Sequence, residues 1–139
     1  MSDLENAKAQ LDKHKIALYK DGKLYTSDKR GVAPMLEFIE SNVDLHGFSA
    51  ADVVVGKAAA MLFAKAGIVS VYAKTISRPA LEFLCKCNID VSYDTLADNI
   101  INRDKTDICP MEKTVLNMDD VDKAFYAIKE KVRLLNAAK

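Results

Sequence analysis

The chain has no tryptophan, few prolines and glycines, and no surplus of charge of either sign. Its 20 basic and 20 acidic side chains cancel, and they form no block of lysine and arginine. Without a basic surface, a protein has no general electrostatic attraction to nucleic acid or to an anionic membrane. We therefore expect neither of these partners.

Long hydrophobic runs and paired cysteines are missing as well. The longest strongly apolar run covers residues 58–64, far short of the roughly 20 residues that cross a bilayer. The first six residues are mostly polar and include two acidic side chains, unlike a signal peptide. The chain has three cysteines, and two of them, Cys85 and Cys87, stand too close together for a disulfide framework. These features predict a reduced, cytoplasmic protein.

What the chain does have is enough apolar material for one core. Half of its 139 residues are hydrophobic, so we assign residues 1–139 to a single domain. Asp21-Gly22 between two short apolar runs predicts a β-hairpin. The patterns predict, in order, a helix over 3–13, strands over 16–20 and 23–27, helices over 34–42 and 50–66, a strand over 68–75, a helix from Ser77 to Asn88, a strand over 91–93, an ambiguous segment with a further edge strand at Ile100-Ile101, a short helix after Cys109 and a last helix from about Asp119.

A hairpin followed by alternating helices and strands is typical of a mixed sheet covered on both faces. The sequence therefore predicts an α/β fold, a three-layer α/β/α domain with a mixed sheet of four to five strands.

Within the expected helix over 50–66, residues 53–63 are apolar all the way round, and Lys57 is the only charge between Asp52 and Lys65. A lysine in such a helix reaches water along its aliphatic stem, pairs with a carboxylate, or lines a cavity. Gly56, beside it, makes a helix about 1 kcal/mol less stable than alanine at the same position would. That cost indicates a close approach at Gly56, either by a ligand or by a neighbouring strand.

Three segments together resemble a known family. They are Val54-Val55-Gly56-Lys57-Ala58-Ala59-Ala60, Asn102-Arg103 and Cys109-Pro110-Met111-Glu112. They are similar to an uncharacterised family of small bacterial and archaeal proteins that is grouped with the cytidine-deaminase-like fold. The resemblance covers roughly residues 12–116. It implies that fold and the order of elements given above, and it implies no reaction.

The metal chemistry of the zinc deaminases does not carry over with the fold. Those enzymes need His-or-Cys-x-Glu at the start of one helix and Pro-Cys-x-x-Cys at the start of the next. Residues 50–66 contain no His, Cys or Glu, and Ala80 and Phe83 stand in the ligand places after Pro79. We therefore expect no zinc site and no other cofactor.

A pocket without its metal can still bind a polar molecule where the two helix N-termini meet. We expect Lys57 and Ser77 in its wall. Asp52 would hold a ligand hydroxyl or pair with Lys57. Ser77 is equally consistent with an ordinary N-cap of the helix that it begins. With Gly56, Asn102 and Arg103, these residues form the expected ligand-binding set.

Cys109 stands where a helix that starts with Pro110 would normally have a capping Ser, Thr, Asp or Asn. The positive end of that helix favours a reactive thiolate, to which Arg103 would add. Glu112 then acts as an acid or base, or it closes a capping box on the N–H of Cys109. The alternative is an inert, buried cap. Cys85 and Cys87 are interpreted as packing residues of their helix.

Two functions from different classes remain open. One is a small-molecule enzyme with Cys109 as nucleophile and Glu112 as proton carrier. The other is a non-catalytic module that binds an anionic or nucleotide-like metabolite. A scaffold without a ligand would leave Lys57 unexplained. We also expect a homo-oligomer, because half of the chain is apolar for a modest surface.

Overall fold

A hairpin near the start of the chain forms one edge of the sheet. Its strands are paired from Ile16↔Ser27 to Lys20↔Lys23, and they are joined by Asp21 and Gly22, both at positive φ. Two consecutive residues at positive φ are what a type I′ turn requires, and Asp-Gly supplies them at low cost. The hairpin is confirmed with the strand bounds that the sequence predicts.

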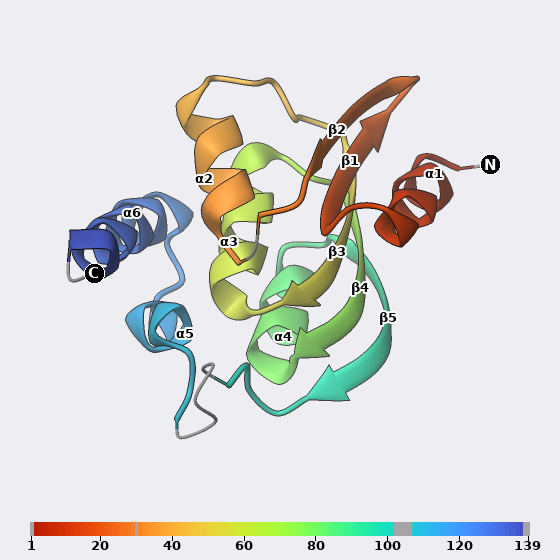
Figure 1. Ribbon diagram of the computed structural model, residues 1–139. Coiled ribbons are helices and arrows are strands. Elements are labelled where there is room, and N and C mark those ends of the chain that lie inside the picture. Colours follow the sequence, from red (N-terminus) through yellow and green to blue (C-terminus); the bar gives the residue numbers. More distant parts are fainter. Residues whose placement is uncertain (1, 30, 102–106, 138–139) are drawn as a thin grey trace.

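The structure is a computed structural model that describes residues 2–29, 31–101 and 107–137 (Figure 1). The elements, in chain order, are α1 (Asp3–Ala9), the 3-10 turn η1 (Gln10–Asp12), β1 (Ile16–Lys20), β2 (Lys23–Ser27), α2 (Ala33–Glu40), β3 (Ser49–Val55), α3 (Lys57–Ala66), β4 (Ser70–Ser77), α4 (Arg78–Lys86), β5 (Asp90–Ala97), α5 (Pro110–Val115) and α6 (Val121–Ala137).

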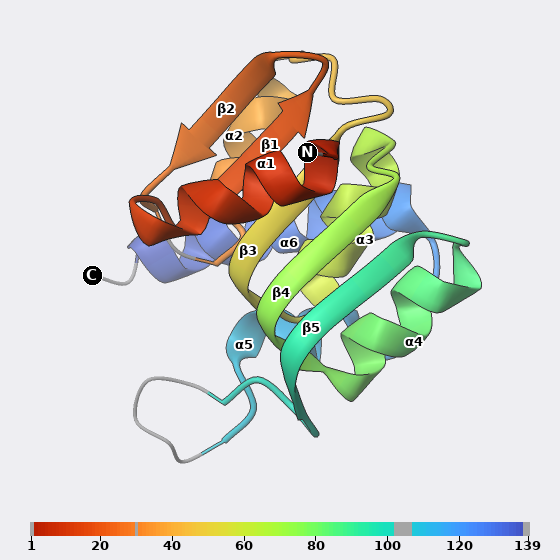
Figure 2. The same ribbon diagram turned by 90° about the vertical axis from the view of Figure 1, so that its right-hand side faces the viewer.

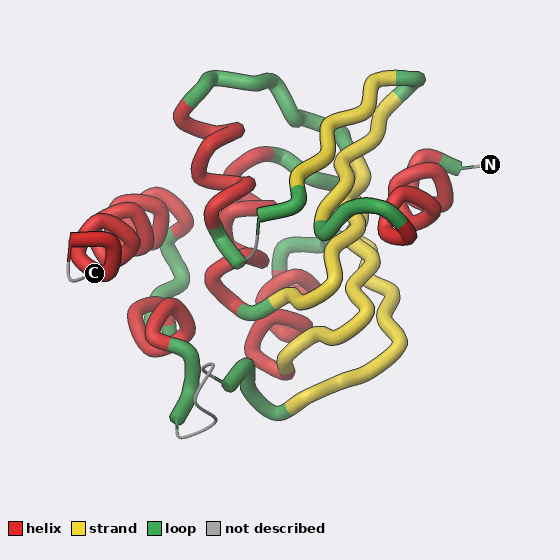
Figure 3. Tube along the Cα trace, in the orientation of Figure 1, coloured by secondary structure: helices red, strands yellow, loops and turns green. Residues whose placement is uncertain are grey.

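The sheet is mixed and has five strands in the order β2-β1-β3-β4-β5 (Figure 3). β1 runs antiparallel to both of its neighbours, whereas β3, β4 and β5 are parallel to one another. α3 connects β3 to β4, and α4 connects β4 to β5. The mixed α/β architecture predicted from the sequence is confirmed, with five strands.

The prediction of one helix over residues 50–66 is wrong. Residues Ser49–Val55 form the central strand β3, and the helix begins only at Lys57. A strand buried on both faces reads as a continuous apolar run, which periodicity alone does not separate from a buried helix. The change from Val53-Val54-Val55 to Ala58-Ala59-Ala60 marks the boundary, because β-branched residues favour strands and alanine favours helices.

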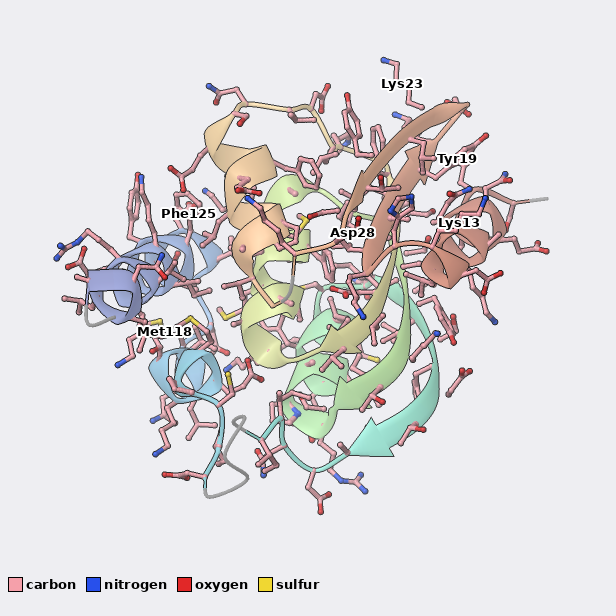
Figure 4. The ribbon with its side chains drawn as sticks, in the orientation of Figure 1. Lys13, Tyr19, Lys23, Asp28, Met118 and Phe125 are labelled. Atoms are coloured by element: carbon pink, nitrogen blue, oxygen red, sulfur yellow. The ribbon has the colours of Figure 1, made fainter. Side chains whose placement is uncertain are left out.

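Helices cover the two faces of the sheet unequally. α1 packs on one face, over β1 and β3, whereas α2, α3 and α4 lie on the other (Figure 1). α5 and α6 form a further layer outside α3, where Met118 and Phe125 pack against the main core (Figure 4). α3 therefore has the sheet on one side and α2, α4, α5 and α6 around it, which explains why it is apolar all the way round.

Pairing of the three parallel strands is interrupted at one level. The register passes over Val53 on β3, Lys74 on β4 and Asp94 on β5. Side chains of a regular strand alternate between the two faces of the sheet, so one residue separates two successive core residues. On β4, two residues separate the buried Ala73 from the buried Ile76. The strands bend there, and Val54 is 43% exposed although β3 is a central strand.

Smaller differences concern the outer helices. Cys85 and Cys87 were expected to pack, but both are exposed, and α4 uses Ala80, Phe83 and Leu84 instead. β5 is longer than predicted. Ile101 forms only an isolated bridge with Ile108 among the described residues.

Candidate functional site

The predicted site lies at the edge of the sheet where the parallel strands end. Gly56 follows β3 and is the N-cap of α3, whereas Ser77 ends β4 and is the N-cap of α4. Because β3 and β4 are parallel neighbours, the two helices begin at the same edge. Ligands of open α/β sheets commonly bind at such an edge.

Glu112 of α5 reaches across to the start of α3. Its carboxylate accepts the main-chain N–H of Lys57 at 2.6 Å through Oε1 and that of Ala58 at 3.0 Å through Oε2. Glu112 is buried, at 7% exposure. Gly56 gives α3 no capping side chain, so a carboxylate from another helix satisfies two N–H groups that would otherwise lack a partner.

Gly56 is the residue that lets Glu112 approach. A Cβ atom added there would lie 2.4 Å from Oε1 of Glu112. The φ of Gly56 is −97°, which any residue can adopt, so the requirement is space rather than backbone freedom. The close approach expected at Gly56 exists, and the group that approaches is the protein's own carboxylate.

Lys57 is also committed to α5. Its ammonium donates a hydrogen bond to the carbonyl oxygen of Leu116, the C-cap of α5, at 3.1 Å. The Lys57 side chain is nearly buried. Lys57 donates to Leu116 and Asp52 accepts from Val53, so the pairing of these two side chains, one of the two roles considered for Asp52, is not formed. α5 is thus held at both ends by the first residue of α3.

The capping box within α5, one of the two roles considered for Glu112, is not formed, because the carboxylate binds the start of α3 instead. Glu112 does not accept the N–H of Cys109, which donates instead to the carbonyl oxygen of Ile100 at 2.9 Å. Burial raises the pKa of Glu112, and the N–H groups of Ala58 and Lys57 and the Lys57 charge only partly oppose this.

Asp52 is a second buried carboxyl, on β3 rather than on a first helical turn. Its Oδ1 accepts the N–H of Val53 at 2.8 Å, at the level where the strand pairing is interrupted. Burial raises the pKa of Asp52 to about 8, against the opposing effect of the N–H groups of Val53 and Val54. Near neutral pH, Asp52 is therefore mostly protonated, and it has a proton to donate.

Ser77 has the ordinary role that was considered for it. Its hydroxyl oxygen accepts the N–H of Ala80 at 3.2 Å, so it caps α4, and the residue is fully buried. The hydroxyl hydrogen of Ser77 remains a donor.

Cys109 occupies the N-cap position of α5 that the sequence predicts, but its side chain makes no capping hydrogen bond. It is partly exposed rather than a buried cap. A surface pocket of about 410 Å³ lies beside it between α5 and α6, and Cys109 itself does not line that pocket. The pocket is lined by Asp107, Ile108, Pro110, Lys113, Thr114 and Lys131.

The predicted residues therefore fall into separate groups. Gly56, Lys57 and Glu112 are in contact, whereas Ser77 and Cys109 each serve the start of another helix. Asn102 and Arg103 lie outside the described residues. Sequence reasoning missed the N–H of Ala58 and the carbonyl of Leu116, because main-chain partners 54 and 59 residues away leave no local signal.

Within the described ranges, no group of three or more His, Cys, Asp and Glu side chains is placed to hold a metal ion. No described helix is long and apolar enough to cross a membrane.

Comparison with known proteins places this arrangement in a family. A family model described as "TM1506: Domain of unknown function (DUF1893)" matches residues 6–132. The crystal structure of a DUF1893 family protein from Thermotoga maritima is similar, with a TM-score of 0.83 and 28% sequence identity over 94% of this chain and 91% of that chain. No curated protein matches the chain.

Proposed function

Since the chain belongs to the DUF1893 family, a domain of unknown function, we propose that it is a binding module for a small anionic or nucleotide-like metabolite, built on a cytidine-deaminase-like scaffold. The ligand's anionic group takes the place of the Glu112 carboxylate at the start of α3. The observation that carries this proposal is the pair of hydrogen bonds from Lys57 N and Ala58 N, which hold a carboxylate at 2.6 and 3.0 Å.

Three features support an anion at this position. The first main-chain N–H groups of a helix have no partner within the helix and lie at the positive end of its dipole, so they favour an anionic acceptor. The ammonium of Lys57 becomes available when α5 moves, because its present acceptor is the carbonyl of Leu116. The carboxylic acid of Asp52, on the strand that leads into α3, is suited to a ligand oxygen.

The strand order and the helices that follow β3 and β4 support the cytidine-deaminase-like assignment. The residues at those helix starts do not fit the zinc of such enzymes. α3 begins Lys57-Ala58-Ala59, and α4 begins with Arg78 and Pro79 and carries Ala80 and Phe83 in the ligand places.

A cysteine-based activity is the second candidate, and the partial exposure of Cys109 favours it. In that reading Cys109 is the nucleophile and Glu112, three residues later, carries the proton. Glu112 would first have to leave the N–H groups of α3, so both candidates require α5 to move. Self-association and a cytoplasmic location also remain proposals.

Titration calorimetry of the wild-type chain with nucleoside monophosphates and with inorganic phosphate tests the binding function. We expect saturable binding of at least one of these anions. Lys57→Met should weaken it at least about tenfold by removing the cation. Lys65→Met changes the same residue type at the far end of α3 and should leave binding unchanged.

Circular dichroism of each variant confirms that it is folded before binding is measured. Absence of saturable binding to any of these anions by the wild-type chain overturns the proposal. So does equal weakening by Lys57→Met and Lys65→Met, because the site would then not be at the start of α3.

A further inference from the structure

The sheet has two edge strands, and they differ in how well they are protected against pairing with another chain. β2 and β5 lie at opposite edges of the sheet (Figure 2). The ladder of β5 with β4 is interrupted at Asp94, and β5 carries a second acidic side chain, Asp90. Interruptions and charges of this kind keep an edge strand from adding a further strand. The edge at β5 is therefore protected.

β2 has less of this protection. Its pairing with β1 is regular from Ile16↔Ser27 to Lys20↔Lys23, and Lys23 is its only charged residue. Leu24 of the same strand is 42% exposed. α1 lies on one face of the sheet and α2 on the other, so neither helix lies beside β2 in the plane of the sheet (Figure 1). Within the described ranges, β1 is the only strand that pairs with β2.

The hairpin fixes which main-chain groups of β2 face the open edge. A β-turn bonds the N–H of its fourth residue, here Lys23, to the C=O of its first, and bonded and non-bonded pairs then alternate along the ladder. Lys23, Tyr25 and Ser27 therefore turn their N–H and C=O groups towards β1. Leu24 and Thr26 turn theirs away from the sheet, where a further strand would bond to them.

We propose that β2 pairs with β2 of a second copy of the chain. The two strands run antiparallel about a two-fold axis that passes through the sheet, perpendicular to it, beside Tyr25. With this centre all five residues of the strand have a partner, and any other centre leaves part of the strand without one. The outward groups of Leu24 bond to those of Thr26 in the other copy, and the reverse pair does the same. Strand addition at an open edge is a common mode of recognition, and the two-fold axis closes it as a dimer.

The side chains of the two copies are compatible in this register. The axis keeps each face of the sheet on its own side, so Tyr25 meets its own copy on the α2 face, where its ring already lies 5.8 Å from those of Phe38 and Phe48. Cross-strand aromatic pairs stabilise a sheet. On the α1 face, the exposed Leu24 meets Thr26 of the other copy, which covers part of its apolar surface.

Charged side chains of the same sign do not oppose one another in this register. Lys23 lies opposite Ser27 of the other copy in a non-hydrogen-bonded pair, the kind in which opposing side chains are closest. Continued past the strand ends, the register sets Asp21 level with Lys29 of the other copy, and Asp28 level with the turn glycine. The edge is therefore complementary to itself, as an isologous interface requires.

Charge substitutions at position 27 test the register. We expect the wild-type chain to be a dimer in sedimentation-velocity experiments. Ser27→Lys sets like charges opposite each other at Lys23 of both copies, so it should weaken the dimer at least about threefold, and Ser27→Glu should tighten it by a similar factor. The chain has no net charge, so the two variants differ from it by equal and opposite amounts and general repulsion between copies is the same for both.

The decisive variant combines Lys23→Glu with Ser27→Lys. It exchanges the two side chains across the axis, so it should dimerise more tightly than Ser27→Lys alone (Lys23 is labelled in Figure 4). The matched controls are Ser92→Lys and Ser92→Glu, at an exposed position of the other edge strand, which should not differ from each other in dimerisation.

Thr26→Pro tests the main-chain bonds. The N–H of Thr26 has no partner in β1, so proline at this position should leave the hairpin ladder intact and remove a hydrogen bond between the copies. We expect a dimer that is at least about tenfold weaker. Circular dichroism shows whether the variant is folded, and if it is not, the charge variants decide.

A wild-type chain that sediments as a monomer at high micromolar concentration overturns the proposal. Equal dimerisation of Ser27→Lys and Ser27→Glu, or a double variant no tighter than Ser27→Lys alone, also overturns it, because Lys23 would then not face position 27 of the other copy. A folded Thr26→Pro variant that dimerises like the wild type has the same consequence.

Discussion

The side-chain position of Gly56 is occupied by the carboxylate of Glu112. A Cβ atom at Gly56 would lie 2.4 to 2.6 Å from the carboxylate atoms, and the two residues are far apart in the chain. The contact joins the start of α3 to α5. Glycine is therefore required at position 56 because the Glu112 carboxylate needs the space, and not because a turn needs a positive φ.

Gly56→Ala should therefore destabilise the protein. Replacing glycine with alanine at an ordinary φ usually stabilises by about 0.4–1 kcal/mol. Here the added methyl group displaces Glu112 from the N–H groups of Lys57 and Ala58, and we expect a loss of about 2 kcal/mol or more in the free energy of unfolding. Urea denaturation followed by circular dichroism measures it.

The matched control removes the carboxylate as well. In a Glu112→Ala background the methyl group of Gly56→Ala meets empty space, and its effect should fall to near zero or become stabilising. An equal cost of Gly56→Ala in both backgrounds would mean that Glu112 is not what limits the space.

Local features of the fold were predictable from the sequence where one short segment contains the whole signal. Asp21-Gly22 predicts the hairpin because both residues adopt positive φ. Ser77 before Arg78-Pro79 predicts the start of α4, since a hydroxyl cap and an early proline satisfy the same helix end.

The site was only half predictable, because its contacts join distant segments. Gly56 and Lys57 stood out as misfits in an apolar run, and Glu112 stood out beside Cys109, but nothing in the sequence pairs them. Main-chain N–H groups and carbonyls, which hold both Glu112 and Lys57, are the same in every residue. The β3–α3 boundary was missed for a different reason, since a doubly buried strand lacks alternation.

Glu112→Gln should weaken the same contact without changing its shape. The amide retains one acceptor oxygen and turns an NH₂ group towards the second N–H of α3, so one hydrogen bond is lost. We expect a decrease of about 1–3 kcal/mol in the free energy of unfolding. Glu37→Gln, at an exposed position on α2 where the carboxylate pairs only with exposed Lys29, should change stability by less than about 0.5 kcal/mol.

Asp52 predicts a distinct pH dependence. Its pKa is about 8 in the folded protein, against 3.8 for an unperturbed aspartate, so the folded state binds the proton more tightly. The stability that this provides is complete below about pH 4 and is lost as the pH rises through about 8. In the Asp52→Asn variant the side chain at position 52 does not titrate, so it contributes no pH dependence to the stability.

The variant should therefore gain on the wild type as the pH rises. We expect Asp52→Asn to be the more stable protein at about pH 9, with the advantage shrinking towards about pH 4, by up to about 1.4 kcal/mol per pH unit. Thermal unfolding across this range measures it. An Asp12→Asn variant, changed at an exposed position, should follow the wild type, and a parallel curve for Asp52→Asn would contradict the prediction.

Cys109 provides the sharpest test of the cysteine-based activity, because exposure and activation now point to different cysteines. Cys85 and Cys87 are exposed, whereas Cys109 is only partly so. If accessibility alone governs the reaction, iodoacetamide modifies Cys85 and Cys87 first. If the start of α5 activates the sulfur, Cys109 reacts first in spite of its lower exposure.

We expect Cys109 to react first, as mapped by mass spectrometry after brief treatment of the folded protein with substoichiometric reagent. Unfolding in urea removes the helix, so the three rates should become similar there. Cys109→Ser should leave stability unchanged or slightly raised, because serine is the better N-cap and the thiol makes no capping bond. If Cys109 in the folded protein reacts no faster than the two exposed cysteines, the proposal that Cys109 is a nucleophile is wrong. Glu112 then acts only as the internal carboxylate of an anion-binding site.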